Sequence, residues 1–123
     1  MSEKPVWDKD AIHARILHIA GLKADWDDEG AVPVNIGAIG LAEDVAVACL
    51  PHQCGIGPCP DGTIDLFWRR DPCDDLYVHI ETMYVATACR VINGEYVTTK
   101  FDGNAASHLA HFAKATLEGD NRP

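Results

Sequence analysis

The sequence predicts an α+β fold: two N-terminal helices, a four-stranded antiparallel meander, and a C-terminal helix packed on one face of the sheet. Apolar residues recur at helical spacing over roughly the first fifty positions, alternate with polar ones from Thr63, and return to helical spacing after Gly103. With 123 residues, 47% hydrophobic and 24% charged, the chain suits a single domain with its own core. Residues 1–6 and 119–123 are expected to be loose tails.

The first predicted helix begins at Asp8, whose carboxylate can accept early backbone N–H groups, and ends near Lys23. Ile12, Ile16 and Ile19 form its apolar stripe. The second predicted helix covers about residues 36–50. Its sequence is apolar on most sides, so we expect it to be covered on more than one side.

Asn35 is the expected N-cap of that second helix, and Pro51 is its expected stop. The proline- and glycine-rich segment that follows, residues 51–62, is predicted to be an ordered loop. From Thr63 the period becomes two, and Ile64, Leu66 and Trp68 share one face of the first strand.

A second strand over residues 76–81 repeats this alternation, which indicates an antiparallel pair with one apolar face. A third strand over about 83–92 and a fourth over 95–100 are joined by Asn93 and Gly94, the strongest hairpin signal in the chain. The sequence leaves open which face of these two strands is buried. The last helix is expected to begin after Asp102 and to end at Gly119.

The densest charge in the chain lies between the first two helices, in a segment that we call the acidic corner (residues 25–33). Its characteristic residues are four carboxylates around one tryptophan, followed by glycine and proline: Asp25, Trp26, Asp27, Asp28, Glu29, Gly30 and Pro33. Three interpretations apply: a structural corner, a cation site, or a partner-binding face.

In the structural interpretation, Trp26 buries its ring, Asp27 accepts backbone N–H bonds, and Gly30 supplies an unusual φ. We assign Trp68 of the first strand to the same structural framework. Asp25 has no structural role in this interpretation and is grouped with the carboxylates that are predicted to bind a partner.

In the cation interpretation, Asp25, Asp27 and Glu29 followed by Gly30 echo the first half of a calcium-binding EF-hand loop. Ile36, however, stands where that loop needs a bidentate glutamate, which favours the structural interpretation.

Two motifs together resemble a known group of proteins. The first is Trp26-Asp27-Asp28-Glu29-Gly30-Ala31-Val32-Pro33, and the second is Pro58-Cys59-Pro60-Asp61-Gly62-Thr63-Ile64-Asp65-Leu66-Phe67-Trp68. They resemble the W-D-G-x-G-A-x-P corner and the P-D-G-x-I-x-L-x-W strand of small uncharacterised bacterial and phage proteins. In this chain Asp28 replaces the usual glycine, and Phe67 stands where an acid is common. The resemblance implies a shared fold and a mobile-element or accessory role, but no activity.

The formal net charge is −9, from 19 acidic and 10 basic residues. That balance argues against direct nucleic-acid binding and against an anionic membrane surface, and it permits a basic protein partner. No secretory signal is visible and no apolar run approaches the ~18 residues of a membrane span. Five cysteines, an odd number, indicate reduced thiols and a cytoplasmic location.

The sequence offers one candidate for zinc. Cys49, His52, Cys54 and Cys59 lie close together, but none of their spacings is the C-x2-C of common zinc sites. Whether these four residues bind metal is left open. A zinc or calcium module is therefore kept as the first alternative function, and no cofactor is assigned.

The second alternative is a small hydrolase that uses cysteine and histidine. His79 and Cys89 can meet across strands, and His108 and His111 can share a helical face. There is no phosphate-binding loop, no nucleophile elbow and no metalloprotease motif, so the sequence does not favour an enzyme.

The favoured function is a non-catalytic protein-interaction module. An inhibitor encoded by a phage or mobile element is one form that such a module takes. Its expected partner-binding residues are Asp25, Asp28 and Glu29 of the corner, together with Asp74 and Asp75 of a second acidic cluster. The expected partner is a basic protein surface, or a second copy of the chain paired along a poorly covered strand edge.

Overall fold

The computed structural model describes residues 7–71, 74–103 and 106–119. It has three helices and five strands in the order α1 (Lys9–Ala20), α2 (Ile36–Ala48), β1 (Gly55–Pro58), β2 (Ile64–Asp71), β3 (Asp74–Thr82), β4 (Val85–Ile92), β5 (Glu95–Asp102) and α3 (Ala106–Leu117). The α+β class is confirmed. The predicted tails lie outside the described residues, except for Gly119.

The sheet is an antiparallel meander in the order β1-β2-β3-β4-β5, so it has five strands where the sequence predicted four. The additional strand, β1, lies in the segment predicted to be a loop. The sequence did not indicate this strand because its glycines and proline give no alternation of apolar and polar side chains. A strand at the edge of a sheet tolerates them, since only one side of its backbone needs to pair. Ile56 is its buried residue and lies opposite Leu66 of β2.

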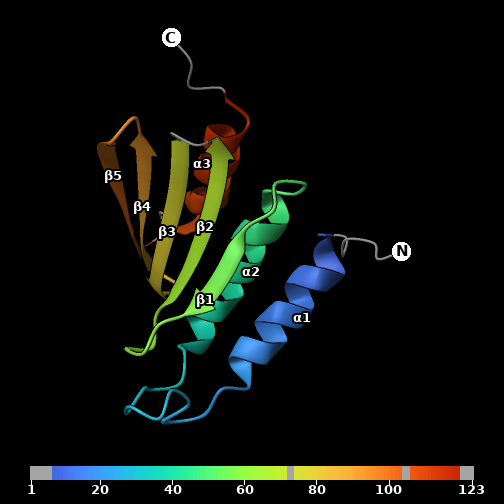
Figure 1. The fold of residues 1–123 in the computed structure, drawn as a ribbon, viewed down its shortest axis with the longest axis vertical. Coiled ribbons are helices and arrows are strands. Elements are labelled where there is room, and N and C mark those ends of the chain that lie inside the picture. Colours follow the sequence, from blue (N-terminus) through green and yellow to red (C-terminus); the bar gives the residue numbers. More distant parts are fainter. Residues whose placement is uncertain (1–6, 72–73, 104–105, 120–123) are drawn as a thin grey trace.

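The helices form a second layer behind the sheet (Figure 1). α2 packs on β2 and β3, while α3 packs on β4 and β5. α1 lies farther out, against α2 and the edge strand β1. Its Arg15 donates a hydrogen bond from Nε to the carbonyl oxygen of Ile56 at 2.9 Å. One outward-facing carbonyl of the edge strand is therefore satisfied by a helix side chain, which helps protect this edge from pairing with another chain.

The helical layer covers one face of the sheet. Ile64, Leu66 and Trp68 of β2 point into the core, as do Leu76, Val78 and Ile80 of β3, so the predicted alternation of both strands is confirmed. The opposite face of the sheet carries the other set of side chains. In β4 and β5 the buried residues are Ala86, Ala88 and Phe101, which answers the question that poor alternation had left open.

Local signals in the sequence set several ends of elements. Asp8 accepts a hydrogen bond from the Ala11 backbone N–H at 2.9 Å, and Asn35 caps α2 by accepting one from Ala38 at 3.0 Å. Asn93 and Gly94 have φ values of 51° and 83°, as the hairpin between β4 and β5 requires. Among the described residues, no helix combines the length and the apolar character that a membrane crossing needs.

Candidate functional site

The acidic corner is closed by hydrogen bonds within its own loop. Oδ1 of Asp27 accepts from the backbone N–H groups of Glu29 at 2.9 Å and Ala31 at 3.0 Å. Oδ1 of Asp25 accepts from the Gly30 N–H at 2.7 Å. These carboxylate oxygens face inward and hold the turn, as the structural interpretation expects.

The backbone of the corner takes three left-handed conformations. Asp25, Asp28 and Gly30 have φ values of 64°, 62° and 88°. Trp26 is half-buried, and its Nε1–H donates to the Val32 carbonyl oxygen at 3.0 Å. Trp26 therefore closes the loop through its indole N–H, and its side chain is partly buried, where the sequence analysis expected the ring to be buried.

The corner docks on the turn between β1 and β2. The Val32 N–H donates to the Pro60 carbonyl oxygen at 2.9 Å, and the Asn35 N–H donates to the Gly62 carbonyl oxygen at 2.9 Å. Both segments lie at the lower end of the molecule in Figure 1. Asp61 on this turn is exposed, so the docking brings a further carboxylate to the end that carries the corner.

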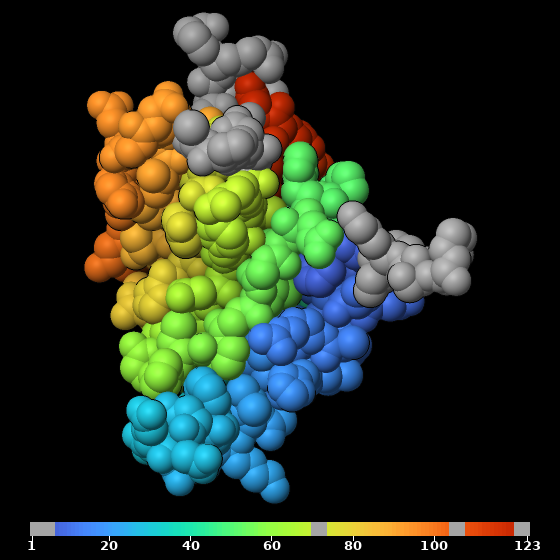
Figure 2. Space-filling model, viewed as in Figure 1, coloured from blue at the N-terminus to red at the C-terminus, as the bar shows by residue number. Residues whose placement is uncertain are grey.

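Large apolar side chains are exposed at the same end. Val32 is 46% exposed, and Ile36, the first residue of α2, is 86% exposed. In the turn between β3 and β4, Met83 and Tyr84 are 48% and 54% exposed. A Cβ added to Gly37 would lie 3.0 Å from Met83 Cβ, so this turn meets the start of α2. In Figure 2 the corner, in cyan, projects at the lower end beside the light-green start of β2.

The second predicted acidic cluster is engaged with arginines. Asp74 is only 8% exposed and contacts Arg90, with Oδ2 3.2 Å from Nη2 and Oδ1 3.3 Å from Nε. Asp75 is half-buried and accepts from Arg69 Nε at 3.0 Å. Asp74 is therefore not a surface for a partner, which corrects the prediction, and Asp75 is largely neutralised. The side chain of Asp71, a third aspartate close to them in the sequence, lies outside the described part of the chain.

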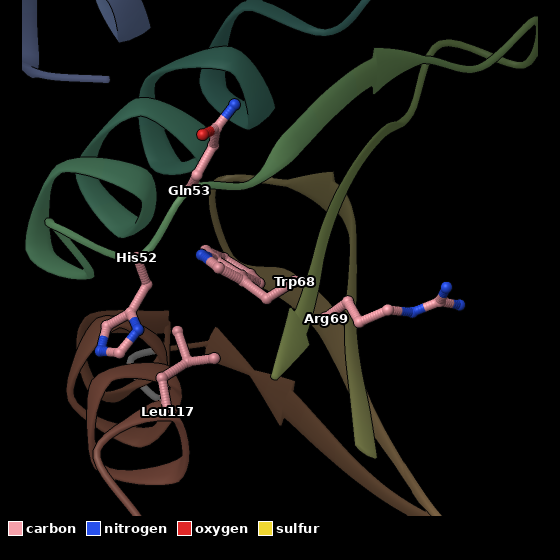
Figure 3. Close-up of a pocket in the computed structure, with 5 residues that line it drawn as sticks. All are labelled: His52, Gln53, Trp68, Arg69 and Leu117. Atoms are coloured by element: carbon pink, nitrogen blue, oxygen red, sulfur yellow. The ribbon is translucent and has the colours of Figure 1, made fainter. Parts of the chain in front are cut away.

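Trp68 lies toward the far end of β2 from the acidic corner and is 1% exposed. It lines a pocket of about 220 Å³ together with His52, Gln53, Arg69 and Leu117. Figure 3 shows that the Arg69 guanidinium points away from this pocket. Within the described residues, the Trp68 Nε1–H has no hydrogen-bond acceptor. Trp68 is thus a core residue of the sheet and not part of the corner with which the sequence grouped it.

The four candidate zinc ligands do not come together. Cys49 and Cys54 are buried, and desolvation raises the pKa of each thiol to about 12. Cys54 and Cys59 flank β1 at opposite ends. Cys59 contacts Asp65 instead, and Cys59, Asp65 and His79 are the only described residues that gather a set of potential metal-ligand atoms. The sequence analysis named Cys59 as a candidate zinc ligand and His79 as a candidate partner of Cys89, but it did not bring these two residues together.

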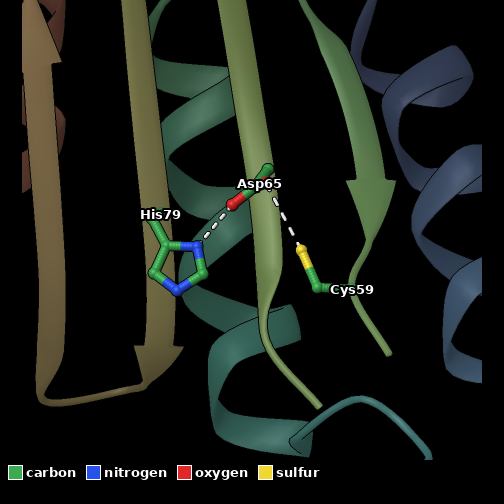
Figure 4. A group of neighbouring side chains, drawn as sticks. All are labelled: Cys59, Asp65 and His79. Atoms are coloured by element: carbon green, nitrogen blue, oxygen red, sulfur yellow. Dashed lines mark hydrogen bonds and ion pairs between the residues drawn. The ribbon is translucent and has the colours of Figure 1, made fainter. Parts of the chain in front are cut away.

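Cys59, Asp65 and His79 form what we call the sheet-face cluster (Figure 4). The Cys59 thiol donates to Asp65 Oδ2 at 3.3 Å, and His79 Nδ1 lies 2.6 Å from Asp65 Oδ1. Asp65 and His79 are direct partners in the pairing of β2 with β3. Sequence analysis missed Asp65, although alternation put it on the same face as Arg69, opposite to the core.

The electrostatics of the sheet-face cluster do not suit a cysteine nucleophile. Burial raises the pKa of the Cys59 thiol, and the carboxylates of Asp65 and Asp61 raise it further, although a hydrogen bond with Thr63 opposes them. Nucleophilic cysteines need the opposite shift. Asp65 also lies between the thiol and the imidazole, so His79 does not accept the thiol proton.

The other candidate pairs are not assembled either. In the register of β3 with β4, Cys89 lies opposite Tyr77, and His79 lies opposite Thr87. His108 and His111 are exposed on α3, and neither belongs to a metal-ligating group among the described residues. No arrangement typical of a hydrolase is formed by the residues that the sequence proposed for one.

Comparison with known proteins adds no family to this geometry: no family model matches the chain, and neither a curated protein nor a solved structure matches it significantly.

Proposed function

We propose that this protein is a non-catalytic protein-interaction module that binds a basic partner through the end carrying the acidic corner. We call this end the corner surface. It comprises the exposed apolar residues Val32, Ile36, Met83 and Tyr84 and the carboxylates of Asp25, Asp28, Glu29 and Asp61. The observation that carries the proposal is the gathering of large apolar side chains beside these carboxylates.

The exposed apolar residues supply the surface area that is buried when the partner binds. Ile36 is 86% exposed, and burying an isoleucine fully is worth about 1.5–3 kcal/mol. Isolated exposed apolar residues are ordinary, but a group with a polar rim is typical of a protein interface. Met83 adds an adaptable side chain, and Tyr84 combines apolar area with a polar tip.

The carboxylates define the chemistry of the partner. Asp28 and Glu29 are exposed, and so is Asp61 on the adjoining turn. The basic residues of the partner are therefore expected to surround an apolar centre, because opposite charges at the rim speed association and select against acidic proteins. Rim charges are screened by salt, so the association rate should fall as ionic strength rises.

A capture experiment with matched variants tests this proposal. The wild-type protein is immobilised and exposed to host lysate, and Ile36→Asp is compared with Tyr96→Ser, which alters an exposed residue on β5. We expect a basic protein that elutes with salt, is lost with Ile36→Asp, and is retained with Tyr96→Ser. Hydrogen exchange on the complex should then protect residues 32–36 and 83–84.

Two results would overturn the assignment of this surface. One is that Ile36→Asp captures the same basic protein as the wild type does. The other is protection confined to the strands of the sheet. Circular dichroism of both variants establishes that each is folded before capture is compared.

A second candidate is a homodimer paired through β5, favoured by the exposure of this edge strand. Tyr96 and Val97 on β5 are 74% and 61% exposed, and β5 has eight residues that hydrogen-bond to β4 alone. A long, exposed edge strand is a template for pairing with another chain. Sedimentation equilibrium tests this: a dimer that Val97→Lys converts to a monomer supports it, and a wild-type monomer at high concentration rejects it.

We also propose a cytoplasmic setting and a phage or mobile-element origin. The cytoplasm is supported by free thiols at Cys49, Cys54, Cys59 and Cys89, because oxidising compartments favour disulfides. The mobile-element origin is supported by the resemblance of the corner and the β2 sequence. Genes beside this one that encode phage or transfer functions would agree with it, and a setting among housekeeping genes would argue against it.

A further inference from the structure

We propose that Cys59, Asp65 and His79 form a binding site for a borderline-soft divalent cation of the Zn²⁺ class on the open face of the sheet. This inference is independent of the corner surface. It assigns a ligand to a group of side chains that the interaction function leaves unused.

The spacing of the potential ligand atoms suits a tetrahedral ion. The sulfur of Cys59, a carboxylate oxygen of Asp65 and a ring nitrogen of His79 all lie within 4.8 Å of one another. Zinc bonds of about 2.3 Å to sulfur and 2.0–2.1 Å to nitrogen or oxygen separate neighbouring ligand atoms by roughly 3.3–3.6 Å. The contact of Asp65 with Cys59 at 3.3 Å lies in that range, whereas the contact of Asp65 with His79 at 2.6 Å is shorter. The carboxylate and the imidazole must therefore move apart to admit the ion.

The ligand types select the class of ion. A thiolate and an imidazole favour Zn²⁺ and similar transition metals, whereas Mg²⁺ and Ca²⁺ prefer an all-oxygen shell. Three protein ligands leave one tetrahedral position for water or for an atom of a partner. Asp65 and His79 are 54% and 43% exposed, so the ion is reachable from solvent.

The charge of the cluster also favours a cation. In the absence of metal, protons bridge Asp65 to the other two ligands. On binding, the Cys59 thiol proton is released to solvent, and the proton on Nδ1 of His79 is exchanged through solvent to Nε2, so that the neutral imidazole binds the ion through Nδ1. The exposed carboxylate of Asp61 lies near enough to Cys59 to affect its thiol. It would add long-range attraction for a divalent ion.

The backbone holds the three ligands in place. The Cys59 N–H donates to the Thr63 carbonyl oxygen at 2.9 Å, and the Gly62 N–H donates to the Cys59 carbonyl oxygen at 3.0 Å. Cys59 is thus fixed by a tight turn, while Asp65 and His79 are fixed by the pairing of β2 with β3. On β1, the residue opposite Asp65 is Gly57, which has no side chain to fill the space beside the carboxylate.

Cobalt spectroscopy on the full chain tests the site. The protein is stripped with chelator under reducing conditions and titrated with Co²⁺, whose thiolate ligation gives a charge-transfer band in the near ultraviolet and whose tetrahedral ligation gives intense visible bands. We expect both bands at one equivalent, displaced by Zn²⁺. Cys59→Ser should abolish the charge-transfer band. Asp65→Asn and His79→Gln should weaken Co²⁺ binding by more than about 100-fold, above the 10–100-fold cost of losing an outer-shell partner.

Two variants serve as matched controls. Cys89→Ser removes another half-buried thiol, and His13→Gln removes another exposed histidine that contacts a carboxylate. Both should bind Co²⁺ as the wild type does. The proposal is overturned if no charge-transfer band forms, if Cys59→Ser retains the band, or if Cys89→Ser removes it. The titration of the folded wild type at one equivalent of Co²⁺ decides by itself whether a thiolate-ligated site forms. The test therefore remains decisive even if a variant is unstable.

Discussion

The acidic corner and the sheet-face cluster both contain carboxylates with several hydrogen-bond partners, but they are built in opposite ways. In the corner, Asp27 accepts from two backbone N–H groups within four residues of itself. In the sheet-face cluster, Asp65 contacts the side chains of Cys59 and His79, which lie 6 and 14 residues away. The corner is made of local contacts, and the cluster is made by the pairing of strands.

This difference shows that a high density of charge in the sequence does not by itself form a binding site. The corner has the densest charge in the sequence, yet the oxygens of Asp25 and Asp27 that face inward are used by its own amides. The cluster has one acid, one thiol and one imidazole, but their ligand atoms converge. A metal or a partner can replace a proton shared between two side chains more readily than it can displace the backbone N–H groups that hold a turn together.

Removing the Asp27 carboxylate should give the largest effect. Asp27→Ala leaves the N–H groups of Glu29 and Ala31 without their acceptor, and hydrogen bonds to a charged group are worth about 1.5–3 kcal/mol each before relaxation and water replace part of the loss. We expect the free energy of unfolding to fall by about 2–3 kcal/mol in urea denaturation. Glu29→Ala, an exposed neighbour, should change it by no more than about 0.5 kcal/mol. Equal losses in the two variants would mean that the corner is held by charge and not by these hydrogen bonds.

The reactivity of Cys59 should depend on Asp65. Burial raises the pKa of the Cys59 thiol, and the negative charge of Asp65 raises it further, so the wild-type thiol carries less thiolate at pH 8 than an ordinary cysteine does. Asp65→Asn removes that charge, lowers the pKa, and should speed alkylation by iodoacetamide several-fold in chelator, measured by peptide mass spectrometry. Cys49 and Cys54, with pKa values of about 12, are internal controls that should stay unmodified. A slower reaction in Asp65→Asn would contradict the assigned sign.

The same carboxylate should contribute little to stability without metal. Asp65 and His79 form a substantially exposed pair, and such pairs contribute about 0–1 kcal/mol. Asp65→Ala should therefore lower the free energy of unfolding by less than about 1 kcal/mol in chelator. A loss as large as that of Asp27→Ala would remove the contrast between the two regions. Added Zn²⁺ should raise the melting temperature of the wild type and leave that of Asp65→Ala unchanged.

The smallest expected effect is at Asp28, whose φ of 62° is the left-handed conformation that glycine adopts without steric cost. Asp28→Gly should relieve strain and, after the added chain entropy of glycine, stabilise the fold by about 0.5 kcal/mol. Asp28→Val should destabilise it, because a β-branched residue is poorly tolerated at this φ. A stable valine variant would show that the loop relaxes.

Much of the fold could be predicted from the sequence because its signals are local. Asp8 and Asn35 cap helices within three residues of themselves, and Asn93-Gly94 forms its hairpin without help from distant residues. The alternation of β2 and β3 needed only an apolar core on one side. β1 was missed because a strand of glycine, isoleucine and proline shows no period, and its pairing with β2 defines it.

The candidate site was predicted only in parts. Exposed carboxylates at Asp28 and Glu29 followed from the acidic corner, but the apolar half of the corner surface did not. The second helix was expected to be covered on more than one side, but Ile36, its first residue, is 86% exposed. Asp74 was expected to be exposed, but it is buried and its carboxylate pairs with Arg90, which lies opposite Leu76 in the pairing of β3 with β4.

The sequence by itself determined the α+β class, the caps, the Asn-Gly hairpin and the inward-facing role of Asp27, since each depends on residues a few positions apart. Only the tertiary structure decided the fifth strand, the docking of the acidic corner on the turn at residues 60–62, and the meeting of Cys59 with Asp65 and His79. The physical reason is register: strand pairing sets which side chains share a face at close range. That pairing gave the corner its apolar neighbours and gave Asp65 its two partners.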